Sequence, residues 1–164
     1  MKNTFIFLVI MLFTSCIPLQ YAPEIENYDI VLAKRFKNDL PRQYAFAFED
    51  HKNANEFYKF VLWKLGRVDM EITENLPLQV GDSTYYMSFY ERSKKSASIN
   101  LIPLIINGEA NGDELYNNEG EYWYILITVI NSDSGDCLHP SYANRHEVIL
   151  ALKELKDEYL DTEF

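Results

Sequence analysis

Residues 121–131 read Glu-Tyr-Trp-Tyr-Ile-Leu-Ile-Thr-Val-Ile-Asn, a run with apolar side chains at both sets of alternating positions. Successive side chains of an extended strand point to opposite faces of the sheet. The two sets are Trp123, Ile125, Ile127 and Val129 on one face, and Tyr122, Tyr124, Leu126 and Ile130 on the other. A strand that is apolar on both faces is typical of the centre of a sheet that is covered on both sides.

Further strands are predicted before this run. Residues 43–48 alternate aromatic with small side chains, residues 68–72 alternate apolar with polar ones, and two further strand segments follow before the run at 121–131. Pro103 lacks an amide hydrogen, so the last of these segments belongs at an edge or contains a bulge. Residues 75–82, which include Pro77 and Gly81, are predicted to form a turn or loop. The three other strand segments are 68–72, 84–91 and 97–106.

Apolar residues at helical spacing predict two helices, over 53–65 and 145–160. Each begins with an Asn followed three residues later by Glu, the spacing of a capping box. Residues 28–38 also fit a helix, although 30–32 fits a strand equally well. The resulting order predicts an α+β fold, an antiparallel sheet of about five strands with two to three packed helices.

The chain is acidic, with 25 Asp and Glu against 15 Lys and Arg and a formal net charge of −10. This balance argues against nucleic-acid binding and against electrostatic docking on anionic lipid, and it favours a basic partner. Residues 28–164 have the length of one ordinary domain, and we predict a single α+β domain over this range.

The N-terminus has the pattern of an export signal. Lys2 is followed by an apolar run over 5–13 and by Thr-Ser-Cys at 14–16. A membrane-spanning helix needs about 20 apolar residues, so this shorter run is typical of a signal peptide. A large apolar residue, two small residues and Cys16 resemble the bacterial lipoprotein signal. Phe13 stands where Leu is usual, as in the looser signals of Bacteroidota.

This resemblance implies that residues 1–15 are removed and that Cys16 carries a thioether-linked diacylglycerol and an acylated amine. Two or more acyl chains give lasting membrane attachment. Ile17 replaces the Asp that retains enteric lipoproteins at the inner membrane, so an outer-membrane location is implied, facing either the periplasm or the surface. Residues 16–27 contain two prolines and no periodicity, and are predicted to be a tether. The alternative is a plain secretory signal that leaves a soluble protein.

Candidate metal ligands and nucleophiles cluster near residues 131–146. Cys137, His139 and His146 could form the centre of a thiol- or metal-dependent hydrolase. The same stretch has the Asp, Ser and Pro content of a loop that joins a strand to a helix. We favour the loop, so no catalytic residue, metal or cofactor is predicted. Cys137 is expected to be buried and inert.

Two candidate binding surfaces remain. Tyr86, Tyr90, Tyr122 and Tyr124 would form a stacking and hydrogen-bonding platform if they lie on an open sheet face. Otherwise they belong to the core.

The second surface is a polar loop over 107–120, which carries Glu109, Asp113 and Glu114. Long loops on a rigid sheet are frequent sites of binding, although this loop is equally compatible with a solvated connection.

These features favour a non-enzymatic binding module of the cell envelope, held by the acyl chains on Cys16. Its expected partner is a basic protein, a peptide or a glycan, and an immunity-type protein that masks a basic toxin is one version. The hydrolase centred on Cys137, His139 and His146 is the alternative, and a structural role in an envelope assembly is a third hypothesis.

Overall fold

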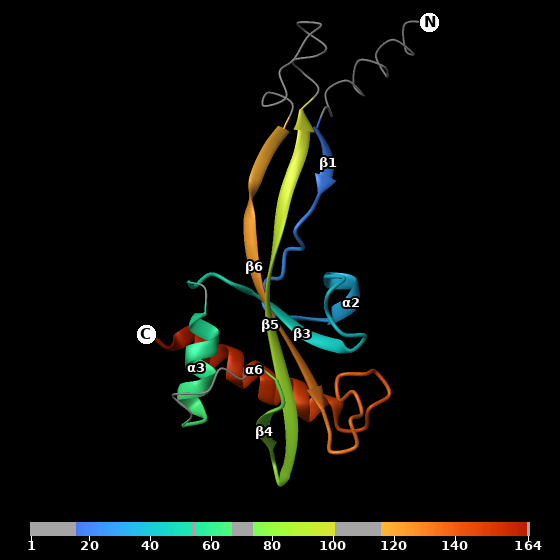
Figure 1. Ribbon diagram of the computed structural model, residues 1–164, viewed down its shortest axis with the longest axis vertical. Coiled ribbons are helices and arrows are strands. Elements are labelled where there is room, and N and C mark those ends of the chain that lie inside the picture. Colours follow the sequence, from blue (N-terminus) through green and yellow to red (C-terminus); the bar gives the residue numbers. More distant parts are fainter. Residues whose placement is uncertain (1–15, 54, 67–73, 101–115, 164) are drawn as a thin grey trace, which may run out of the picture. The chain divides into compact units, whose positions relative to one another are not determined.

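The computed structural model describes residues 16–53, 55–66, 74–100 and 116–163 (Figure 1). Within these ranges the chain forms strands and helices in mixed order, which confirms the predicted α+β class. The strands are β1 (Cys16–Gln20), β2 (Asp29–Leu32), β3 (Tyr44–Asp50), β4 (Leu76–Val80), β5 (Ser83–Asn100) and β6 (Tyr116–Ile130). The helices are α2 (Ala33–Phe36), α3 (Glu56–Lys64) and α6 (Arg145–Asp161).

The strands form one sheet in the order β1-β5-β6-β3-β2, and β4 pairs with β5 beside this path. The pairs β1–β5, β2–β3, β3–β6 and β4–β5 are antiparallel. Strand β6 lies between β5 and β3, the central place that its two apolar faces predict. No helix within the described ranges is long and apolar enough to cross a membrane.

The chain divides into two compact units. The described part of the first unit consists of residues 16–23, 93–100 and 116–122, and the second unit contains the other described residues. The predicted domain over 28–164 therefore contributes to both units. Residues 16–20, predicted to belong to a tether, form β1 and pair with the end of β5.

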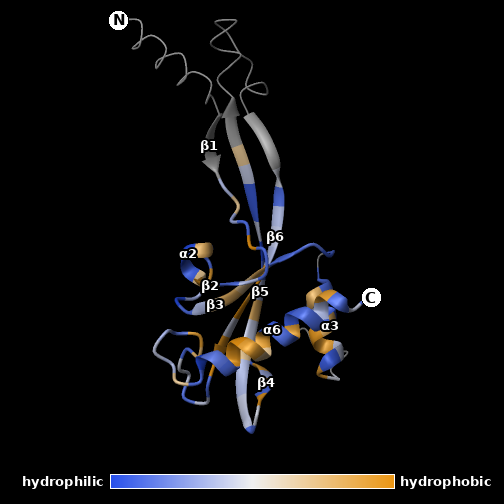
Figure 2. Cartoon of the chain, turned by 180° about the vertical axis from the view of Figure 1, so that it is seen from behind, coloured by the Kyte–Doolittle hydropathy of each residue, from blue (hydrophilic) through white to orange (hydrophobic). Residues whose placement is uncertain are grey.

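The main hydrophobic core belongs to the second unit and lies between the sheet and helices α3 and α6 (Figure 2). The apolar stripes predicted for these helices are buried in it. Among its members are Phe46 and Phe48 of β3, Ile125 and Ile127 of β6, Phe57 and Phe60 of α3, and Leu152 and Tyr159 of α6.

The opposite face of β6 is covered as well. Tyr124 and Leu126 have no exposed surface. The ring of Phe36, from the short helix α2, meets the Tyr124 ring edge-on with 5.1 Å between the centroids. Both faces of β6 are therefore buried at this point, as predicted.

The loop predicted over 75–82 is wrong, because strand β4 occupies most of this range. It joins β5 through a two-residue turn in which Gly81 has φ 58°, the left-handed value that a type II′ turn requires at its first central position. Hydrogen-bonded and non-hydrogen-bonded pairs alternate from the turn, so Pro77, opposite Tyr86, falls at a non-hydrogen-bonded pair. Its missing amide hydrogen therefore costs no bond to β5, and the proline is tolerated inside the strand.

Other boundaries also differ from the prediction. The segment predicted as a helix over 28–38 divides into β2 and α2, so the strand alternative holds for its first half. The strands predicted over 84–91 and 97–106 belong to the single strand β5 as far as Asn100, beyond which the second lies outside the described residues. The strand predicted over 68–72 lies outside them entirely.

The start of α3 is not the predicted capping box. The Asn53 side chain donates to the carboxylate of Glu56 at 2.9 Å, and no side chain caps the helix amides. Asn55 stands at the N-cap position with a left-handed φ of 67°, a conformation that Asn tolerates better than most residues.

Candidate functional site

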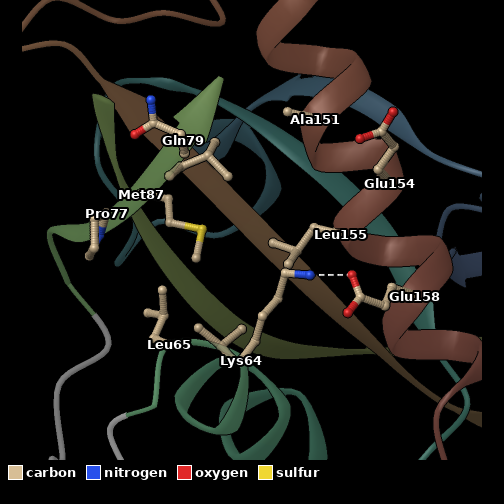
Figure 3. A pocket seen from close by; sticks show the side chains of 11 residues that line it. Lys64, Leu65, Pro77, Gln79, Met87, Ala151, Glu154, Leu155 and Glu158 are labelled. Atoms are coloured by element: carbon tan, nitrogen blue, oxygen red, sulfur yellow. Dashed lines mark hydrogen bonds and ion pairs between the residues drawn. The ribbon is translucent and has the colours of Figure 1, made fainter. Parts of the chain in front are cut away.

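A groove of about 460 Å³ opens in the second unit between α3, β4 and α6 (Figure 3). Its floor consists of apolar side chains that are at most 8% exposed: Val61, Leu78, Met87 and Leu155. Its walls and rim are formed by Lys64 and Leu65 of the α3 end, Pro77 and Gln79 of β4, and Ala151, Glu154 and Glu158 of α6.

Helical spacing explains which residues face the groove. Glu154 and Leu155 lie three and four residues after Ala151, and Glu158 lies four and three residues after them, so the four residues share one side of α6. Val61, Lys64 and Leu65 do the same on the last turn of α3 and its C-cap. The groove is thus built from three segments that are distant in sequence.

The rim of the groove carries more negative than positive charge. The Lys64 ammonium forms an ion pair with the Glu158 carboxylate, which links α3 to α6 (Figure 3). Because both side chains are about 40% exposed, such a pair contributes about 0–1 kcal/mol. Glu154 adds a second, exposed carboxylate. The groove therefore offers an apolar floor beside a net negative rim.

Of the four predicted platform tyrosines, two lie on the same face of one strand in the second unit. Tyr86 is 38% exposed, and half-buried Tyr90 lies four residues further along β5, on the same face of the strand. Tyr122 is also 38% exposed but belongs to the first unit. For Tyr124 the platform is wrong and the core alternative holds, because its ring is fully buried against Phe36 and cannot form part of an open surface.

Tyr90 also borders a second, smaller hollow of about 370 Å³ in the second unit. The Glu91 carboxylate there accepts a hydrogen bond from the Asn55 amide at 3.3 Å. Burial, together with the charge of Asp50, raises the pKa of Glu91. The guanidinium of Arg92 lies 5.9 Å from the centre of the Tyr90 ring. The other lining residues are Tyr58, Glu74 and Phe89.

The acidic-loop residues Glu109, Asp113 and Glu114 lie outside the described residues, and their role stays a prediction. The cluster near Cys137 lies within them and forms a structured loop. The Asp136 carboxylate accepts hydrogen bonds from the amides of Tyr44 (2.7 Å) and Leu138 (3.0 Å), so it fastens the loop to β3.

Two residues of the hydrolase hypothesis, Cys137 and His139, form hydrogen bonds with neighbours in the same loop. The Cys137 thiol is fully buried and donates to the Gly135 carbonyl at 3.4 Å. His139 Nδ1 accepts from the Ser141 amide at 3.2 Å, and His146 is exposed on the first turn of α6. In the part of the chain that the structure describes, no group of three or more His, Cys, Asp or Glu could hold a metal ion.

Cys137 is expected to resist alkylation in the folded protein. Its sulfur is buried, and burial raises the pKa of the thiol, so little thiolate is available at neutral pH. We expect no iodoacetamide adduct on Cys137 at pH 7.5 by intact mass, and full modification in denaturing urea. Rapid modification of the folded chain would contradict this and would favour the hydrolase hypothesis.

No protein-family model, curated protein or solved structure matches this chain. Sequence patterns did not indicate the groove, because its walls meet only in the tertiary structure. One sequence signal could have found part of the groove, because Ala151, Glu154 and Glu158 fall beside the apolar stripe of the predicted last helix. Pro77 and Gln79 fall in the segment over 75–82 that is predicted to be a loop.

Proposed function

We propose that this chain is an exported, lipid-anchored protein of the bacterial cell envelope and a non-enzymatic binding module. Its groove between α3, β4 and α6 binds a peptide segment of a partner protein that presents an apolar side chain next to a basic one. The observation that carries this proposal is the apolar floor beside the carboxylates of Glu154 and Glu158.

The size of the groove suits such a segment, since ligand pockets typically have volumes of about 300–1,000 Å³. Full burial of a Leu or Ile side chain contributes about 1.5–3 kcal/mol, so the floor supplies affinity. A cation at the exposed rim adds less affinity, but it orients the segment and accelerates association. The net charge of −10 attracts a basic partner over a longer range.

The envelope location is supported by the sequence before and at Cys16, which resembles a lipoprotein signal. Because the chain is acidic, attachment to the membrane depends on acyl chains rather than on charge. An acidic, tethered module that captures a basic segment suits an immunity-type protein that masks a basic toxin.

Site-specific photocrosslinking tests the groove. We place benzoylphenylalanine at Gln79, an exposed rim residue, and at Glu147, an exposed residue of α6 outside the groove. In native envelopes, the probe at position 79 is expected to crosslink one partner protein, and the probe at position 147 is not. Equal yields at the two positions would contradict a specific groove.

A pair of substitutions on α6 supplies the matched control. Ala151→Arg places a bulky cation in the groove and is expected to abolish the crosslink from position 79. Leu150→Arg makes the same charge change at a neighbouring residue that is 45% exposed and does not line the groove, so the crosslink is expected to persist. Thermal unfolding confirms that both variants are folded. A crosslink that survives Ala151→Arg would overturn the proposed site.

A further inference from the structure

The first unit places the predicted lipidation site inside a strand. Cys16 is the first residue of β1, and its backbone pairs with Asn100, the last residue of β5. The next strand of the sheet, β6, begins at Tyr116 at the same end of this three-stranded ribbon (Figure 1). We call the backbone of Cys16, Asn100 and Tyr116 the anchor end.

The chain that follows Cys16 stays on the ribbon. Ile17 and Pro18 pair with Ile99 and Ser98 of β5. The Ala22 amide then donates to the Ser96 hydroxyl at 3.0 Å, and both residues are buried. Residues 16–22 are therefore fastened along β5, which leaves no free linker between an acyl group on Cys16 and the ribbon.

Charge does not hold the ribbon on a membrane. Its described residues include two lysines, Lys94 and Lys95, and two glutamates, Glu119 and Glu121, which balance to zero while the whole chain carries −10. In sequence, Asn100 is followed by the six apolar residues 101–106. The segment between Asn100 and Tyr116 also carries Glu109, Asp113 and Glu114, so contact of this unit with an anionic lipid surface depends on the acyl chains rather than on charge.

We infer that the anchor end rests directly on the lipid surface, an inference that depends on the proposed lipidation of Cys16. Acyl chains in the bilayer hold the Cys16 backbone at the membrane interface. Asn100, on the adjacent strand, then lies about 5 Å from it, within a headgroup layer about 5–8 Å thick. With the ribbon end-on to the membrane, Lys95, five residues back along β5, lies about 17 Å away and outside that layer.

Fluorescence quenching in proteoliposomes tests this placement. The full-length chain is extracted from membranes, and an environment-sensitive dye is attached to Asn100→Cys or, as the control in the same strand, to Lys95→Cys. Buried Cys137 stays unlabelled, which the chain without an added cysteine checks. The liposomes contain phosphatidylethanolamine and phosphatidylglycerol with a headgroup nitroxide lipid. We expect the dye at position 100 to be quenched at least threefold more than the dye at position 95.

The outcomes separate this inference from the proposed function. Intact mass first establishes whether Cys16 carries a diacylglycerol; its absence would overturn both the proposed anchor and the inference. A lipidated protein with equal quenching at the two positions, or with none at position 100, would overturn the inference alone. If Asn100→Cys disturbs the strand, Tyr116→Cys at the start of β6 provides a second probe with the same expected result.

Discussion

Replacing Phe57 by Ala is expected to lower the free energy of unfolding by about 3–5 kcal/mol. The Phe57 ring is 1% exposed and lies at the centre of an aromatic cluster. Its centroid is 5.8 Å from that of Phe48, 5.1 Å from that of Phe89 and 5.0 Å from that of Tyr159, with steep interplanar angles in each case. Truncation removes these edge-to-face contacts and leaves a cavity between α3, α6 and the sheet.

Urea denaturation followed by circular dichroism measures this loss. The matched control is Trp63→Ala on the same helix, because the Trp63 ring is 59% exposed. A substitution at the surface is expected to change stability by about 0.5 kcal/mol. Similar losses for the two variants would contradict the central place assigned to Phe57.

Replacing Asp50 by Ala is expected to destabilise the fold by about 1–3 kcal/mol, because it leaves a buried hydroxyl without its acceptor. The Asp50 side chain is 5% exposed, and each of its carboxylate oxygens lies 3.0 Å from the Tyr159 hydroxyl. The Lys52 amide donates to the same carboxylate at 3.1 Å. Burial and the Asp50 charge raise the pKa of Tyr159, so the phenol remains a donor at neutral pH.

Asp50→Asn is the control for this prediction, because it keeps the side-chain shape and one acceptor oxygen. We expect its loss in urea denaturation to be smaller than that of Asp50→Ala. If the carboxylate made no net contribution to stability, the losses of the two variants would fall in the reverse order, or both losses would be negligible. The Lys52 side chain also donates to the carbonyls of Tyr159 and Thr162, so this network fastens the end of α6 to the loop after β3.

Elements with a clear period were predictable from sequence. The two apolar faces of β6 identified a central strand, and the apolar stripes identified α3 and α6, because periodicity reports which side of an element is buried. It does not report what covers that side. Sequence alone left Tyr124 between an open platform and the core, because nothing in its own strand indicates that Phe36 of α2 covers it.

Strand β4 and the groove were missed for related reasons. Pro77 and Gly81 are local signals of a turn, but the pairing with β5 tolerates the proline and uses the glycine at the turn itself. The groove depends on the meeting of α3, β4 and α6, and no local pattern encodes that meeting. By contrast, the loop at Cys137 was predicted correctly, since its Asp and Asn side chains bond to nearby backbone amides.

The proline in β4 also bears on self-assembly. With the proposed lipid anchor, copies of the chain would meet one another in two dimensions at high local concentration, where an exposed strand edge could recruit the same edge of a neighbour. At a non-hydrogen-bonded pair the backbone groups point away from β5, and Pro77 presents a carbonyl there without an amide hydrogen. This edge is therefore a poor template for stacking copies of the chain into fibres.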